Sequence, residues 1–315
     1  MSEFAQQLMQ VVTMRSISIL VVFAVEIVSS VFAAPVSGTL VFGGVERHYI
    51  YVVPPGYDGK TAISLVLIFH GAGNDGALLE QTLGFTDLQR KRTFLAVYPN
   101  GIDKAWNGGR TQPTSDESAK SDDVGFVGAL IDVLGAKFHI DPKRIFATGS
   151  SNGAIFCDTL AVRLSDRIAA IGPVNGNLSP TIASKYKQKS QVSVISFNGT
   201  ADPFVQFAGD PEPGQELFST PDTIAYWVKM NGCDPSPLVT VIPKAVPDDG
   251  TAVKRFDFEG GRANTEVVAY IIAQGGHTWP GFHTYPGWAK IAGKTAMSVD
   301  ATKAIIEFFE KHPKP

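Results

Sequence analysis

The sequence has little of several features that would place it in a well-marked class of protein. It has only two cysteines in 315 residues and no Cys/His cluster with the spacing of a zinc site. Its formal net charge is −3, with no basic patch and no long acidic run, which argues against a nucleic-acid partner and against an acidic interaction tail. Beyond residue 34, no apolar run is long enough to cross a membrane. These absences leave a globular protein with a large core, since 44% of its residues are hydrophobic.

The first 34 residues carry a pattern typical of a secretory signal peptide. Arg15 precedes an apolar run from Ile17 to Val31, and small residues follow that suit cleavage near Ala33 or Ala34. The alternative is an uncleaved membrane anchor, but the run is short for a span of about 20 residues and contains Glu26. We therefore predict a protein that is secreted, outside the cell or into the periplasm, and that has no stable membrane insertion after signal cleavage.

Residues 35–315 alternate between apolar, β-prone runs and helical segments. Continuous apolar strands separated by helices are typical of a mostly parallel sheet covered on both faces. No clear linker interrupts the pattern, so we predict a signal peptide at 1–34 and a single α/β domain at 35–315. The expected strands are 38–42 and 46–53 at a sheet edge, then 64–69, 94–98, 144–148, 169–173, 192–197 and 266–272. The expected helices are 78–92, 122–138, 154–164, 220–230 and 298–312, with a polar loop at 102–121 and a hairpin-bearing excursion over 243–250 and 256–262.

The most informative motif is Gly149-Ser150-Ser151-Asn152-Gly153. It is a Gly-x-Ser-x-Gly sequence between an apolar β-prone run and a helical segment, which is the context of a nucleophile elbow. In such an elbow, a sharp turn exposes the serine at a helix N-terminus, and the flanking glycines leave room for the turn to pack. The motif alone is weak, because five small residues also form ordinary turns. Ser151 is therefore a candidate nucleophile that needs partners.

Two later residues could supply those partners. A serine nucleophile needs a base and a group that orients the base, and in α/β sheets such groups follow the carboxyl ends of strands. Asp202 lies in the turn after the expected strand 192–197, and His277 lies in a Gly-rich turn after the last expected strand. Each also fits an ordinary turn. Together, the order Ser151, Asp202, His277 is that of α/β-hydrolase triads, and it predicts a catalytic triad.

The same reasoning predicts an oxyanion hole and several substrate contacts. The expected backbone N–H donors are those of Asn152, just after the nucleophile, and of Ala72, in the loop that follows the strand 64–69. The alternative is that this loop merely turns the chain. Candidates for contact with the substrate are His70, Trp106 and Trp279, because aromatic side chains on loops at this edge suit a planar acyl group or a sugar. Trp279 equally fits a role in packing beside the histidine turn.

The cysteines leave two alternatives open. In an exported protein, Cys157 and Cys233 could form one disulfide. However, Cys157 falls on the expected helix just behind the elbow, where a buried free thiol is equally expected.

Several sequence pieces together carry a resemblance to a known family. The pieces are His70-Gly71, Tyr98-Pro99-Asn100-Gly101, Trp106-Asn107, Asp122-Asp123-Val124-Gly125-Phe126, the elbow, Asn198-Gly199-Thr200-Ala201-Asp202-Pro203 and Gly275-Gly276-His277-Thr278-Trp279-Pro280-Gly281. With these pieces the chain resembles the secreted esterases grouped as poly(3-hydroxybutyrate) depolymerase-like and feruloyl or acetylxylan esterase-like α/β hydrolases. The resemblance implies an α/β-hydrolase fold, a carboxylic ester hydrolase, no cofactor, and the triad predicted above. The chain departs from the family pattern at Ala154, where a second glycine is common, and in the short Ala-Gly-Asn sequence after His70-Gly71.

Three functions remain after this reading. The first is a feruloyl or acetyl esterase acting on plant polysaccharides, and the second is a hydrolase of polyhydroxybutyrate-type oligomers. The third, of another class, is a non-catalytic binding protein with the same fold, which the intact Ser-Asp-His set argues against. We expect an ester substrate, either small or polymeric, with no metal, no cofactor and no nucleic acid. The segment between the strands 169–173 and 192–197 is too short for a large helical lid, which favours an open cleft.

Overall fold

The structure is a computed structural model that describes residues 34–110, 115–210, 216–282 and 286–315. The predicted signal peptide, apart from its last residue, lies outside the described residues. No helix within the described ranges is long and apolar enough to span a bilayer.

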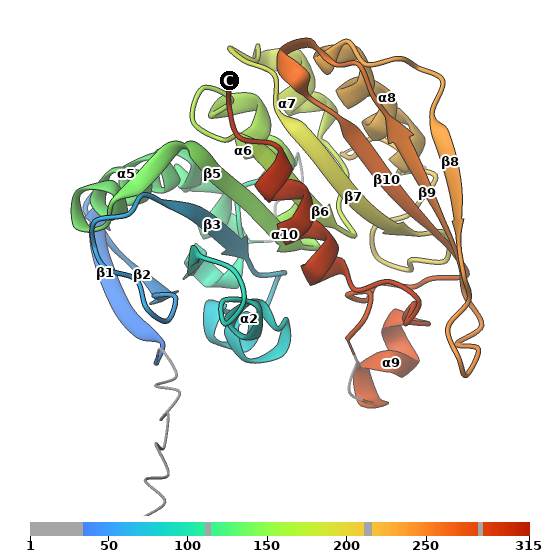
Figure 1. Cartoon of the computed structure of the whole chain (residues 1–315), viewed down its shortest axis with the longest axis horizontal. Helices are drawn as coiled ribbons and strands as arrows, with labels where there is room; N and C mark the ends of the chain where they lie inside the picture. Colours follow the sequence, from blue (N-terminus) through green and yellow to red (C-terminus); the bar gives the residue numbers. More distant parts are fainter. Residues whose placement is uncertain (1–33, 111–114, 211–215, 283–285) are drawn as a thin grey trace, which may run out of the picture. The chain divides into compact units, whose positions relative to one another are not determined.

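The described residues form a ten-stranded sheet in the order β1-β2-β4-β3-β5-β6-β7-β10-β9-β8 (Figure 1). The six central strands, from β4 to β10 in this order, run parallel. Antiparallel strands β1 and β2 extend one side, and β9 and β8 extend the other. The predicted mostly parallel α/β sheet is therefore confirmed. The strands are β1 Val36–Phe42, β2 Val45–Val52, β3 Ile63–Phe69, β4 Phe94–Pro99, β5 Ile140–Ser150, β6 Ala170–Val174, β7 Ser193–Gly199, β8 Leu238–Ile242, β9 Ala252–Phe258 and β10 Val267–Ala273.

Helices cover both faces of the sheet because the central strands are apolar on both faces. In β3, Leu65 and Leu67 belong to one buried cluster, and the alternating residues Val66 and Ile68 belong to another. Helices α5, α6 and α8 contribute to the first cluster, and α2, α3 and α10 contribute to the second; Figure 1 shows α10 crossing the front of the sheet. The helices are α2 Gly76–Thr82, α3 Phe85–Leu88, α4 Asp116–Lys120, α5 Asp123–Lys137, α6 Asn152–Arg163, α7 Pro180–Lys185, α8 Thr220–Asn231, α9 Pro286–Ala292 and α10 Ala301–Lys311, with 3-10 turns at Ile102–Lys104 and Arg262–Asn264.

The helix predicted over 78–92 is wrong in its extent. The structure has two short helices there, α2 and α3, separated at Gly84. Gly84 has a φ of +68°, in the left-handed region that favours glycine. A Cβ atom at this position would also lie 2.8 Å from the ring of Phe282, so the break depends on a contact distant in sequence.

Other differences concern short elements. The stretch 102–121, predicted as a polar loop, contains a 3-10 turn and α4. The excursion predicted around 243–262 is a hairpin, but its strands β8 and β9 lie at 238–242 and 252–258 and extend the sheet. Helices α7 and α9 were not predicted. Between β6 and β7 the chain contains one short helix, α7.

Candidate active site

Ser151 lies at a sharp junction between β5 and α6. β5 ends at Ser150, α6 begins at Asn152, and Ser151 itself has φ +57° and ψ −122°. A residue with a side chain rarely adopts this conformation, and such strain persists only where the surroundings impose it. Here the backbone N–H of Ser151 donates to the carbonyl of Val174 at 3.0 Å, at the end of β6. The strand–turn–helix geometry of a nucleophile elbow is therefore present at the predicted serine.

The two glycines of the motif allow β3 to approach the elbow. A Cβ atom at Gly149 would lie 2.6 Å from the carbonyl oxygen of Phe69. One at Gly153 would lie 2.3 Å from the same oxygen and 2.6 Å from that of His70. Because the atoms met are backbone atoms at the end of a buried strand, a larger residue would force the elbow away from β3. These glycines hold the serine turn against the loop that begins at His70.

Asp202 and His277 form a buried pair. The Nδ1 atom of His277 lies 2.7 Å from Oδ2 of Asp202, and both side chains are almost fully buried. The other carboxylate oxygen accepts the backbone N–H groups of Phe204 at 2.8 Å and Val205 at 2.9 Å. Because a carboxylate only accepts, Nδ1 of His277 carries the proton, and in the neutral imidazole Nε2 is then free to accept one. This is the tautomer that a general base requires.

Backbone contacts join the turns that carry these residues. The N–H of Ala201 donates to the carbonyl of Gly275 at 2.9 Å, which connects the aspartate turn to the histidine turn. The side chain of Asn175 donates to the carbonyl of Thr278 at 2.8 Å, and Asn175 directly follows the residue that accepts the N–H of Ser151. The structure therefore brings the three turns of Ser151, Asp202 and His277 together at the carboxyl edge of the parallel strands.

His70 fixes the orientation of the loop beside the elbow. It is fully buried, and its Nε2 atom accepts the backbone N–H of Gly101 at 3.0 Å. Its Nδ1 atom must then carry the proton, and it donates to the carbonyl of Gly71 at 2.9 Å. Burial lowers the pKa of His70, which keeps the ring neutral and preserves this tautomer. In a trans peptide the N–H points opposite to the C=O, so the N–H of Ala72 points away from the His70 ring.

Both predicted oxyanion donors lie next to the serine turn. A Cβ atom at Gly71 would lie 3.3 Å from Cβ of Ser151, so the loop that contains Ala72 packs against the elbow. Asn152 is the first residue of α6, where a backbone N–H has no acceptor within the helix. Its side chain accepts the N–H of Trp106 at 2.7 Å and donates to the carbonyl of Trp106 at 3.0 Å. Asn152 thereby holds a second loop beside the elbow.

The three predicted substrate contacts are all buried. Besides His70, Trp106 is 2% exposed, donates to the carbonyl of His70 at 3.0 Å and stacks on Phe156. Trp279 is 7% exposed and donates to the hydroxyl of Thr302 at 2.9 Å, which connects the histidine turn to α10. Burial favours roles for these side chains in supporting the site, and contact with a substrate stays a prediction.

Sequence reasoning missed an aromatic pair beside the candidate base. Phe204 is 49% exposed, and its ring centroid lies 5.1 Å from that of His277 in an edge-on arrangement. Its other neighbour is Trp288 of α9, at 5.5 Å and nearly parallel. The sequence offered one signal for this pair, namely that Phe204 lies only two residues after the predicted catalytic residue Asp202.

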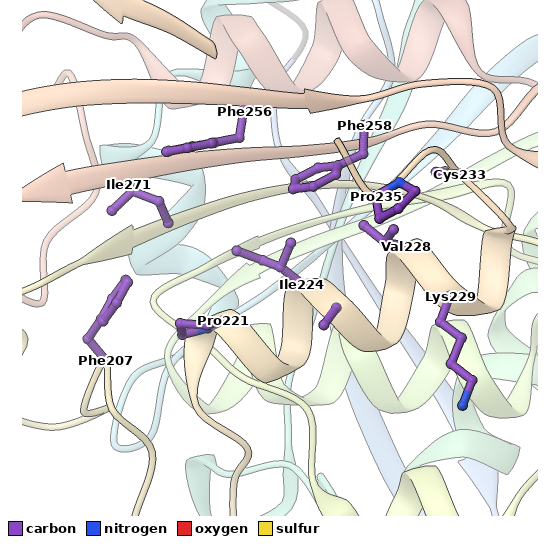
Figure 2. A pocket seen from close by; sticks show the side chains of 11 residues that line it. Phe207, Pro221, Ile224, Val228, Lys229, Cys233, Pro235, Phe256, Phe258 and Ile271 are labelled. Carbon is purple, nitrogen blue, oxygen red and sulfur yellow. The ribbon is translucent and has the colours of Figure 1, made fainter. Parts of the chain in front are cut away.

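An apolar cavity of about 630 Å³ is a second feature to weigh against the triad turns. Figure 2 shows it between α8 and the strands β9 and β10, with the end of the Lys229 side chain turned away from the other labelled side chains. No member of the predicted triad lines it. Its apolar lining offers no paired nucleophile and base, so it is not the candidate active site. Lining side chains include Phe207, Pro221, Ile224, Phe256, Phe258 and Ile271.

The two cysteines are free thiols, and the described ranges contain no candidate metal site. Cys157 and Cys233 are both free and buried, which decides the alternative left open by the sequence. Burial raises the pKa of both thiols, so they stay protonated and poor nucleophiles. Over the described residues, no cluster of three or more His, Cys, Asp or Glu side chains could hold a metal ion.

Several known proteins resemble this chain in sequence. The sequence model of the family described as "Esterase PHB depolymerase" matches residues 47–206. The "Putative esterase NocK" of Nocardia uniformis subsp. tsuyamanensis is 26% identical over 255 residues, which cover 78% of this chain and 73% of that protein. The feruloyl esterase C of Emericella nidulans is 24% identical over 237 residues, which cover 73% of this chain and 76% of that protein.

A solved structure shares the fold. The acetyl xylan esterase from Aspergillus awamori superposes with a TM-score of 0.57 and 14% sequence identity, covering 88% of this chain and 99% of that one. At this identity the likeness establishes the α/β-hydrolase type of fold alone.

Proposed function

The chain belongs to the esterase PHB depolymerase family of carboxylic ester hydrolases, and from this premise we propose that Ser151, Asp202 and His277 are its catalytic triad. The observation that carries the proposal is the strained, positive-φ conformation of Ser151 beside the turns of the buried Asp202–His277 pair. We further propose that residues 35–315 are a single catalytic domain and that residues 1–34 direct its secretion.

The first half of the reaction follows from the tautomer of the histidine. Nε2 of His277 takes the hydroxyl proton of Ser151 as Oγ attacks the ester carbonyl carbon. The carbonyl oxygen gains the negative charge and is held by the N–H groups of Ala72 and Asn152. The tetrahedral intermediate then collapses, the bond to the alcohol oxygen breaks, and that oxygen takes the proton from Nε2. An acyl group remains on Oγ.

Water completes the cycle by the same route. Nε2 of His277 takes a proton from water as its oxygen attacks the acyl carbon, and the oxyanion forms again at the same two donors. Collapse releases the carboxylic acid and returns the proton to Oγ of Ser151. Asp202 accepts the Nδ1–H throughout and stabilises the imidazolium form.

Feruloyl or acetyl esters of plant polysaccharides are the proposed substrates. Support comes from the names of sequence relatives, which include feruloyl esterases and a bifunctional acetylxylan esterase/xylanase. One short helix, α7, lies between β6 and β7, which suits an open cleft and a bulky ester. A second candidate is a polyhydroxybutyrate-type oligomer, which the description of the family favours.

A turnover panel tests both the triad and the substrate class. Purified wild-type chain would be assayed on methyl ferulate, acetylated xylan, hydroxybutyrate oligomers and short p-nitrophenyl esters. We expect clear turnover of feruloyl or acetyl esters and its loss in Ser151→Ala, while the exposed-site control Ser184→Ala stays active. Full activity of Ser151→Ala would remove the triad assignment, and a clear preference for hydroxybutyrate oligomers would replace the substrate class.

A further inference from the structure

An aromatic pair, the exposed Phe204 and the half-buried Trp288, lies directly beside the proposed base. Phe204 makes an edge-on contact with His277 and lies nearly parallel to Trp288, with an interplanar angle of 2°. About half of the Phe204 surface is exposed. The exposed surface of the pair is therefore available to a bound molecule next to His277.

The pair is fixed to the triad by backbone bonds on both sides. The N–H of Phe204 donates to Asp202, so the position of Phe204 follows that of the carboxylate. Trp288 lies on α9, whose last residue, Ala292, accepts the backbone N–H of His277 at 2.6 Å. Because each ring belongs to a segment bonded to a triad residue, the pair has a defined place relative to the reacting atoms.

That place is on the alcohol side of the ester. In the proposed mechanism, Nε2 of His277 gives its proton to the oxygen of the departing alcohol, so the alcohol leaves next to the imidazole. The carbonyl oxygen faces the other way, toward the donors at Ala72 and Asn152. A ring in contact with His277 is therefore closer to the alcohol portion than to the oxyanion hole.

We propose that Phe204 and Trp288 form a binding platform for the alcohol portion of the ester, and that this portion is a sugar ring. The proposal rests on the proposed function of the triad. A sugar ring presents a flat face of C–H groups, which complements the electron-rich face of an aromatic ring. The alcohol portion of a hydroxybutyrate oligomer is a flexible aliphatic chain without such a face. An aromatic ring therefore favours the sugar over the aliphatic chain.

Two feruloyl esters with different alcohols test the platform. Methyl ferulate and a feruloylated arabinoxylan oligosaccharide share the acyl group, so any difference between them lies on the alcohol side. The variants are Phe204→Leu and Trp288→Leu, which keep an apolar side chain but remove the ring. Phe204→Tyr should restore the wild-type values. Tyr186→Leu is the matched control. Tyr186 directly follows α7, is a partly exposed aromatic residue, and packs its ring against Arg163.

We expect each ring-removing variant to raise KM for the sugar ester by about three- to tenfold, with kcat nearly unchanged. Kinetics on methyl ferulate should change by less than about twofold, and the pH profile should stay the same. Circular dichroism would verify that each variant folds.

Three results would overturn the proposal. Equal losses on both esters, with a shifted pH profile, would make the pair a positioning element for His277. Unchanged kinetics on both esters would remove any role in binding. A loss confined to hydroxybutyrate oligomers, assayed as a third substrate with the same variants, would assign the platform to a polyester. Failure of the proposed function is distinct from these results, because it would show as no turnover of any ester by the wild-type chain or as full turnover by Ser151→Ala, and neither depends on the platform variants.

Discussion

Replacing His70 with leucine should disable the oxyanion hole without touching the triad. In the native structure, the Nδ1–H of His70 holds the carbonyl of Gly71, and this sets the direction of the Ala72 N–H. Without the imidazole, the Gly71–Ala72 peptide loses one of its two fixed contacts, since the N–H of Asn74 still donates to the Gly71 carbonyl at 3.2 Å. The peptide can then rotate, and we expect the rotated form, which lacks the Ala72 donor, to predominate.

The expected loss of kcat in His70→Leu follows from the contribution of one oxyanion donor to catalysis. Removing a single oxyanion donor typically lowers kcat by about 10²- to 10³-fold, and KM changes much less because the charge develops only in the transition state. We expect His70→Leu to fall in this range. The N–H of Gly101 also loses its acceptor, which should lower the free energy of unfolding by about 1–3 kcal/mol.

The assay must separate this effect from general destabilisation. His312→Leu is a matched control, because His312 is also a buried histidine that hydrogen-bonds a backbone carbonyl, that of Phe308, but it follows α10. We expect a comparable loss of stability in urea unfolding and no change in kcat on a p-nitrophenyl ester. A folded His70→Leu variant with kcat within about threefold of wild type would refute the reasoning.

Three further substitutions test other parts of the site. Gly153→Ala should destabilise the fold by more than about 2 kcal/mol and abolish turnover, because its Cβ would lie 2.3 Å from the carbonyl oxygen of Phe69. The control Gly135→Ala has open space around its Cβ, so it should leave the thermal stability unchanged or raise it. Asp202→Asn should lower kcat by about 10³- to 10⁴-fold with the fold retained, since an amide no longer favours the Nδ1–H tautomer of the histidine; a loss below about tenfold in steady-state kinetics would count against the assignment. Burial raises the pKa of Asp158 to about 7 from 3.8, so the stability due to its bound proton is fully present below about pH 3.8 and is lost as the pH rises through 7. Between about pH 5 and about pH 8.5, the free energy of unfolding measured in urea should fall by roughly 2–3 kcal/mol for this reason. This fall should be absent in Asp158→Asn. The same pH dependence in the wild-type protein and in Asp158→Asn would contradict the prediction.

The strands and the elbow could be predicted because their signals are local. An apolar run followed by Gly-x-Ser-x-Gly needs no distant partner to be recognised, and the structure has the sharp turn at Ser151. Asp202 and His277 could be proposed from order alone, because the carboxyl ends of parallel strands meet at one edge. The hydrogen bond between these two side chains is a tertiary contact across 75 residues, which position in the sequence can suggest but not measure.

The surroundings of the site could not be predicted because their partners are distant in sequence. Trp106 and Trp279 lie in loops, and loops usually run over the surface. Both are buried here because Trp106 is held by Asn152 and Trp279 by Thr302. The aromatic pair beside His277 also joins residues far apart in the chain, and one of them lies on α9, a helix too short to give a periodic signal.

Covalent labelling tests the central claim, that Ser151 is the nucleophile activated by His277, most directly. The intact chain would be treated with a fluorophosphonate, which phosphonylates activated serines, and the adduct would be located by peptide mass spectrometry. The account predicts one adduct per chain, on Ser151, with no labelling in Ser151→Ala and much slower labelling in His277→Ala. An adduct on another serine, or labelling at the wild-type rate in Ser151→Ala, would contradict it.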